Sequence, residues 1–151
     1  MEKLNSDVIH FFQNQGFVIV STIDDKGMPH NSCKGIVEIK SNGEVFLLDL
    51  YHSKTYANLN KNPSISITAV DEHKFKGYCL KGITRLIKGD KLDNELIRAW
   101  EDRITSRLTQ RVLKNISGQK GHARHPEIML PEPKYLIQMQ VEEIVDLAPH
   151  L

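Results

Sequence analysis

Apolar and polar residues alternate along several short stretches of the chain, which is the period of a half-buried β-strand. The clearest alternation covers residues 64–70, where isoleucine recurs between serine and threonine. In residues 134–145, one alternating face contains Tyr135, Ile137, Met139, Val141 and Glu143. Strand-like apolar content also occurs in residues 17–23, 31–39 and 78–87, and in a stretch that begins at Val45 and ends at Asp49 and Leu50. The pattern predicts about six strands.

Glycine, proline and asparagine mark the turns between these strands. Residues 24–29, Asp-Asp-Lys-Gly-Met-Pro, predict a turn, and Asn42-Gly43 is a strong short signal for a β-hairpin. These two turns predict that the first three strands form an antiparallel meander. A barrel closes the edges of about six short strands better than an open sheet does, so we expect a small, largely antiparallel barrel.

Three stretches have helical patterns. Asn5-Ser-Asp7 can cap a first helix, which Gly16 would end. A short second helix opens at Ser53-Lys54-Thr55 and stops before Asn62-Pro63. In residues 91–116, apolar side chains recur about every four positions, which predicts a long amphipathic helix of roughly 35–40 Å. A small barrel does not need so long a cover, so we expect part of this helix to pack against another subunit.

The start of the second helix carries an unusual charge. Ser53 is a favourable N-cap, but Lys54 falls in the first turn, where the helix dipole disfavours a cation by ~0.3–1 kcal/mol. A bound anion would explain this placement, because the free N–H groups of the first turn, two hydroxyls and an ammonium together suit a phosphate. An ordinary serine-capped helix with a solvated lysine explains the same residues, and no glycine-rich loop precedes them.

Composition and charge indicate one ordinary globular domain. The chain has 151 residues, 40% hydrophobic and 26% charged, with a net charge of +1. We therefore expect a single domain over residues 1–151. The near-neutral charge favours neither nucleic acid nor a membrane as a partner. The first residues lack the basic-then-apolar order of a signal peptide, so a cytoplasmic location is expected.

The cysteines and histidines give little support to a metal site, and none is predicted. Cys33 and Cys79 lack metal-type spacing and are expected to be reduced core thiols. His122 and His125 lie three residues apart in a stretch rich in Gly, Pro and His. They are interpreted either as polar loop residues or as a pair that could bind haem.

The order of these features resembles the pyridoxamine 5′-phosphate oxidase-like flavoproteins, whose fold is the FMN-binding split barrel. The resemblance extends over about residues 17–87. It rests on Gly27-Met-Pro-His30, on Ser53-Lys-Thr55 with Asn58-Leu59, and on Asn62-Pro63. It implies a mainly β fold with flanking helices, an antiparallel six-stranded split β-barrel and one long helix in the C-terminal half. It also implies a homodimer with FMN at the subunit interface.

The resemblance assigns roles around the FMN phosphate and the flavin ring. Lys54 would pair with the phosphate, and Ser53 and Thr55 would donate hydroxyl or backbone hydrogen bonds. The edge of the isoalloxazine ring would meet the second strand at Asn31, Ser32, Cys33 and Lys34.

The remaining implied contacts come from other strands. Asp49 and Leu50 would lie along the ring and the ribityl chain. Lys34, near the pyrimidine side, could stabilise the anionic reduced ring and raise its potential. Tyr78 and Lys81 are interpreted either as contacts from the partner subunit or as a core-edge tyrosine and a surface lysine.

Three functions from different classes remain open from the sequence. The first is an FMN-dependent oxidoreductase on an unidentified small substrate, although no side chain stands out as an acid, base or nucleophile. The second is a non-catalytic carrier of haem, flavin or deazaflavin. The third is an interaction module that uses Arg103, Arg107 and Arg111, although a solvated helix face explains the same row.

True pyridoxamine phosphate oxidase activity is not expected from these residues. Members with that activity carry a C-terminal tryptophan and an Arg-x-His element that grips the substrate. Residues 145–151 have neither, and Arg124-His125 matches the element in neither order nor position.

Overall fold

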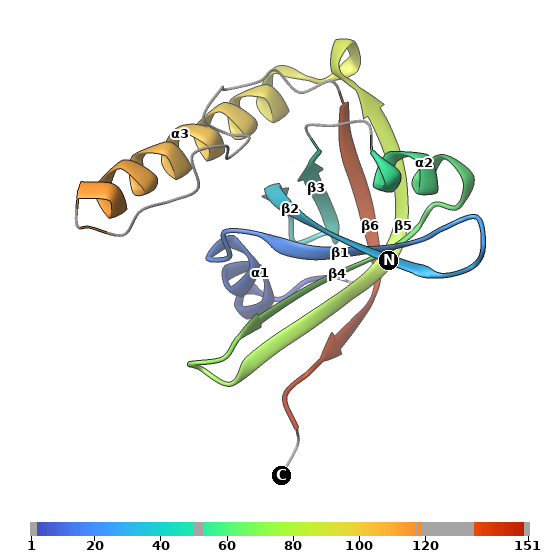
Figure 1. Cartoon of the computed structure of the whole chain (residues 1–151), viewed down its shortest axis with the longest axis horizontal. Coiled ribbons are helices and arrows are strands. Elements are labelled where there is room, and N and C mark those ends of the chain that lie inside the picture. The colour runs from blue at the N-terminus through green and yellow to red at the C-terminus, as the bar shows by residue number, and fades with distance from the viewer. Residues whose placement is uncertain (1–2, 50–52, 117, 119–134, 150–151) are drawn as a thin grey trace.

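Six antiparallel strands form a closed barrel in the order β1-β2-β3-β6-β5-β4, and β4 pairs back onto β1 (Figure 1). This computed structural model describes residues 3–49, 53–116, 118 and 135–149. The strands are β1 (Val18–Ile23), β2 (Pro29–Ile39), β3 (Glu44–Leu48), β4 (Ser64–Asp71), β5 (Lys76–Lys88) and β6 (Tyr135–Asp146). The helices are α1 (Ser6–Gln13), α2 (Lys54–Lys61) and α3 (Asn94–Ile116), with a short 3-10 helix η1 (Gly89–Lys91). The expected mainly β, six-stranded antiparallel barrel with flanking helices is confirmed.

The barrel interior is filled by one hydrophobic core to which all six strands contribute. The predicted first helix is present as α1, and Asn5 caps it by accepting a hydrogen bond from the N–H of Val8 at 2.9 Å. Its side chains Val8, Phe11 and Phe12 are buried and join the core of the barrel. Burial of these three apolar side chains, at roughly 1.5–3 kcal/mol each, holds α1 on the strands.

A second, smaller cluster forms under the long helix α3. Leu96, Trp100 and Ile104 are buried against Phe46, Leu48 and Leu136, on the outside of β3 and β6. The helix begins slightly later than predicted because Asp93 accepts a hydrogen bond from the N–H of Leu96 at 2.8 Å. Figure 1 shows the rest of α3 extending beyond the barrel. Within the described ranges, no helix combines the length and apolar character needed to cross a membrane.

A bulge interrupts the alternation predicted for the last strand. The register of β5 against β6 shifts between Lys81, which pairs with Glu143, and Gly82, which pairs with Val141. The extra residue on β6 turns Glu143 outward, where it is exposed beside Lys81. Assigning Glu143 to the same face as Val141 was therefore wrong, because a one-residue insertion moves all later residues of the strand to the opposite face.

Candidate functional site

The first turn of α2 is open at the position expected to bind an anion. Ser53 is the N-cap residue, with φ −108° and ψ −159°, but its side chain makes no capping hydrogen bond. Lys54 is the first helical residue and is exposed, and the first turn has no acidic residue. Among the described residues, no N-cap side chain thus accepts from the N–H groups of this turn, and the Lys54 cation lies in the same turn.

Two buried polar side chains on the other face of α2 hold it against the barrel. Thr55 is fully buried, and its hydroxyl lies 2.9 Å from the hydroxyl of Ser32 on β2. One turn later, the amide of Asn58 donates to the hydroxyl of Thr22 on β1 at 3.0 Å. These hydrogen bonds fix the helix, so that Ser53 and Lys54 face outward while Thr55 faces the strands.

A buried ion pair lies next to this helix. Lys34, on the same side of β2 as Ser32, places its Nζ 2.7 Å from Oδ1 of Asp49 at the end of β3. The hydroxyl of Tyr135, the first residue of β6, donates to the other carboxylate oxygen of Asp49. Asp49 is 1% exposed and the Lys34 side chain 10% exposed, so the pair is shielded from water. The order β2-β3-β6 brings these three residues together.

Burial raises the pKa of the Tyr135 phenol well above its ordinary value near 10. The hydrogen bond to Asp49 and the negative charge of Asp49 raise the same pKa further. The ring of Tyr56, on α2, packs edge to face against that of Tyr135 with centroids 4.8 Å apart. Tyr135 is thus a neutral donor within this cluster, whereas the sequence placed it only on one alternating face of the last strand.

Tyr135→Phe should change how stability depends on alkaline pH. Because the folded-state pKa is raised, the contribution of the hydroxyl is fully present below about pH 10 and is lost as pH rises above that value. Urea unfolding should show the variant less stable by about 1–2 kcal/mol at neutral pH, with a smaller difference above about pH 10. Tyr56→Phe is the control, and an unchanged gap at alkaline pH would show that the Tyr135 hydroxyl does not titrate with unfolding.

The candidate residues on β2 divide between its two faces. Ser32 and Lys34 belong to the inward-facing set, whereas Asn31 and Cys33 are exposed on the outer surface. The Oδ1 of Asn31 accepts a hydrogen bond from the hydroxyl of Ser21 at 2.5 Å. The structure therefore joins Ser32 and Lys34 to Thr55 and Asp49, and it places Asn31 and Cys33 elsewhere. Leu50 lies outside the described residues.

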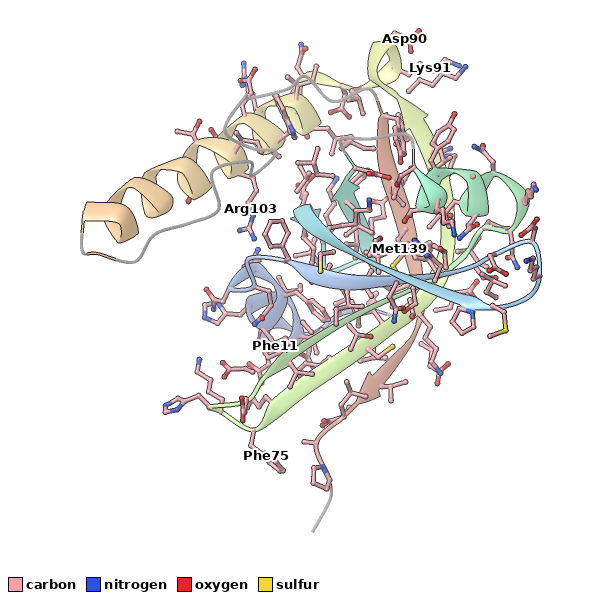
Figure 2. All side chains as sticks on the ribbon, in the orientation of Figure 1. Phe11, Phe75, Asp90, Lys91, Arg103 and Met139 are labelled. Carbon is pink, nitrogen blue, oxygen red and sulfur yellow. The ribbon has the colours of Figure 1, made fainter. Side chains whose placement is uncertain are left out.

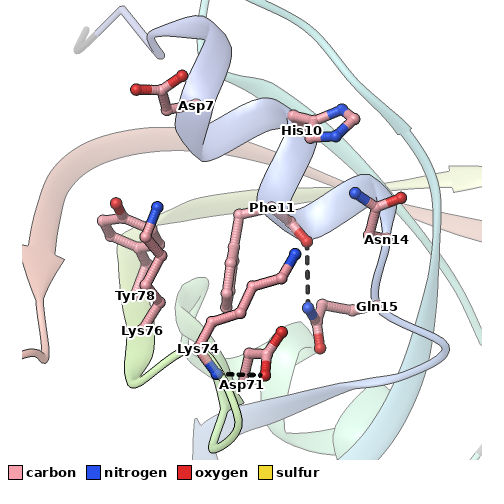
Figure 3. Close-up of a pocket in the computed structure, with 9 residues that line it drawn as sticks. All are labelled: Asp7, His10, Phe11, Asn14, Gln15, Asp71, Lys74, Lys76 and Tyr78. Carbon is pink, nitrogen blue, oxygen red and sulfur yellow. Dashed lines mark hydrogen bonds between the residues drawn. The ribbon is translucent and has the colours of Figure 1, made fainter.

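The two candidates on β5, Lys81 and Tyr78, also lie apart from the cluster of Ser32, Lys34, Thr55 and Asp49. Lys81 is on the outer surface, with its Nζ 3.2 Å from a carboxylate oxygen of Glu143. Tyr78 instead packs against Phe11 of α1, with ring centroids 5.2 Å apart. A cavity of about 180 Å³ lies between α1 and the turn joining β4 to β5, and Tyr78 is one of the residues that line it (Figure 3). Cys79 is half-buried rather than fully in the core, and Cys33 is exposed.

Arg103 has a structural role that was not predicted when Arg103, Arg107 and Arg111 were considered as an interaction surface. It donates to the backbone carbonyl oxygens of Gln13 at 3.2 Å and Gln15 at 2.6 Å, which lie at the end of α1. Figure 2 shows Arg103 pointing from α3 toward that helix. A cation at the C-terminal end of a helix is favourable, so Arg103 holds α3 against α1. The side chains of Arg107 and Arg111 lie outside the described part, as do His122 and His125.

Four large apolar side chains are exposed on the outer surface of β1, β4 and β5. The outward-facing Ile19 and Ile23 of β1, Val70 of β4 and Ile83 of β5 are 47%, 38%, 63% and 40% exposed. We call these four residues the outer apolar face.

Among the described residues, no group of three or more His, Cys, Asp or Glu is placed to hold a metal ion.

Comparison with known proteins identifies clear similarities in fold. The family model described as pyridoxamine 5′-phosphate oxidase matches residues 6–146. The structure of HupZ from Group A Streptococcus gives a TM-score of 0.65 at 19% identity, covering 96% of this chain and 94% of its own. HutZ, the haem storage protein from Vibrio cholerae, gives 0.54 at 20% identity, covering 95% and 94%.

A third similar structure comes from Clostridium acetobutylicum. It is a protein of the pyridoxine phosphate oxidase family related to general stress protein 26 of B. subtilis, with a TM-score of 0.57 at 16% identity. The match covers 94% of this chain and 92% of that protein. No curated protein matches the sequence.

Proposed function

Because the chain belongs to the pyridoxamine 5′-phosphate oxidase family, we propose that it is an FMN-binding protein, and that it works as an oxidoreductase on a small molecule. The observation that carries the proposal is the open first turn of α2. Ser53 leaves the turn without a side-chain cap and Lys54 stands exposed beside it. Backbone N–H donors, a hydroxyl and an ammonium together fit a phosphate monoester.

The neighbouring residues suit the rest of a flavin nucleotide. The hydroxyls of Ser32 and Thr55 and the ion pair of Lys34 and Asp49 lie on the strand ends beside α2. Ser32 and Lys34, which are partly exposed, could hydrogen-bond the N–H and carbonyl groups of an isoalloxazine ring, while the buried Thr55 and Asp49 hold them in place. Bound FMN would supply the electron-transfer chemistry, while these residues would position it.

A homodimer is part of the same proposal. The outer apolar face would be the contact between subunits, because burying exposed side chains such as Ile19 and Val70 against a second copy removes apolar surface from water. Asn31 and Cys33 lie on the same outer surface and would then be at the interface. The mass of the native protein in solution tests this part, and a monomer would remove it.

Lys54→Ala should weaken FMN binding about 10- to 100-fold, because one charge-assisted contact to the phosphate is worth about 1.5–3 kcal/mol. Riboflavin lacks the phosphate, so its affinity should be unchanged by the substitution. Lys61→Ala, at the last turn of the same helix, is the matched control and should leave FMN binding intact. Fluorescence quenching of each flavin on titration with protein measures the affinities of wild type and of both variants for FMN and riboflavin.

Two results would reject the proposed site or cofactor. Equal weakening of FMN and riboflavin by Lys54→Ala would show that Lys54 does not bind the phosphate. A thermal midpoint that excess FMN leaves unchanged would reject FMN itself, since a ligand of the native state must stabilise it. A Soret band on haem addition, without flavin binding, would favour the carrier of haem instead.

A further inference from the structure

Asp49 connects three parts of the barrel through one buried carboxylate. One oxygen lies 2.7 Å from Nζ of Lys34 on β2, and the other accepts the hydroxyl of Tyr135 on β6. At 1% exposure, the carboxylate has lost its contact with water. A charge in such a place acts strongly on its neighbours because the surrounding dielectric is low.

The ion pair borders the proposed phosphate site. Lys34 and Ser32 are two positions apart on the same side of β2, and Ser32 contacts Thr55 in the first turn of α2. A ligand anchored at that turn and extending along β2 would therefore meet the Lys34–Asp49 pair. The pair carries one positive and one negative charge, so its net charge is zero.

Resting on the proposed function, we infer that Asp49 is a positioning residue that sets the charge of the cofactor site by compensating Lys34. The oxidised flavin ring is neutral, whereas the ring reduced by two electrons and one proton is an anion. A free ammonium would favour the anion, and a compensated ammonium favours neither form strongly. Asp49 therefore keeps the potential of the bound flavin lower than Lys34 alone would.

Asp49→Asn should favour the reduced cofactor over the oxidised one by about tenfold, which raises the two-electron potential by about 30 mV. Lys34→Met leaves a lone carboxylate and should shift the potential downward by a similar factor. The double variant Lys34→Met/Asp49→Asn has no charge at either position and should return close to wild type. Potentials are measured by equilibrium reduction of each FMN complex against a reference dye.

The outcomes separate this inference from the proposal on which it rests. If wild type does not bind FMN, the proposed function fails before any potential is measured. If wild type binds FMN but Asp49→Asn leaves the potential unchanged or lowers it, the role of Asp49 is overturned. Circular dichroism checks that each variant is folded. Should Asp49→Asn not fold, a downward shift in Lys34→Met supports the inference, and an unchanged potential in that variant overturns it.

Discussion

Replacing Gly82 with alanine should destabilise the protein by about 3 kcal/mol, because the added methyl group would collide with backbone rather than with a movable side chain. A Cβ at this position would collide with the carbonyl oxygen of Gln140 and lie 2.9 Å from its carbonyl carbon and 3.1 Å from Cα of Val141. The close approach occurs at the bulge where β5 pairs with β6. Relief would require these two strands to separate.

Gly16→Ala is the control for this substitution, since nothing lies within 4 Å of a Cβ placed there. Its free energy of unfolding should stay within about 0.5 kcal/mol of wild type. Urea unfolding followed by circular dichroism gives both values. Equal stability of the two variants would mean that β5 and β6 are not packed as closely as the bulge indicates.

Lys34→Met should destabilise the protein by about 3–5 kcal/mol, the usual cost of removing one partner of a buried ion pair. The loss arises at Asp49, whose carboxylate is 1% exposed and would lose the ammonium that lies 2.7 Å away. Adding Asp49→Asn to Lys34→Met should recover most of the lost stability, because the neutral amide needs no cation as a partner. The free energies of unfolding of the two single variants and the double variant form a thermodynamic cycle.

Lys81→Met provides the comparison for an exposed ion pair. Its Nζ lies 3.2 Å from Glu143, but both side chains are more than half exposed, at 51% and 57%. Water and salt screen such a pair, so the substitution should cost no more than about 1 kcal/mol. If the two lysine variants lost the same stability, burial of the Lys34 pair would have no energetic consequence.

Local sequence signals located the strands, the turns and the cap of α1, but they placed the end of α1 at Gly16, whereas its C-cap is Asn14. The cap at Asn5 and the turn at Asn42-Gly43 were identified correctly because each depends on a few adjacent residues. The face of Glu143 was wrong because a bulge reverses the alternation without any mark in residue type. Helix α3 starts three residues later than predicted because Asp93 accepts a hydrogen bond from the N–H of Leu96.

The candidate site was only partly accessible to sequence reasoning. Lys34 and Asp49 were assigned to the site by the family resemblance, and Thr55 by the first turn of the second helix. Their contacts depend on β2, β3 and β6 being neighbours, and Tyr135 follows Asp49 by 86 positions in the chain. Such long-range pairings have no local signal. The division of β2 between Ser32 and Lys34 on one side and Asn31 and Cys33 on the other follows from its alternation.

The absorption spectrum of the protein as purified, with the mass of whatever cofactor it releases, tests the central claim that α2 and β2 bind FMN. We expect a flavin spectrum and a released molecule with the mass of FMN. A colourless protein that stays colourless after incubation with FMN would contradict it. A Soret band, or a released deazaflavin, would contradict it equally.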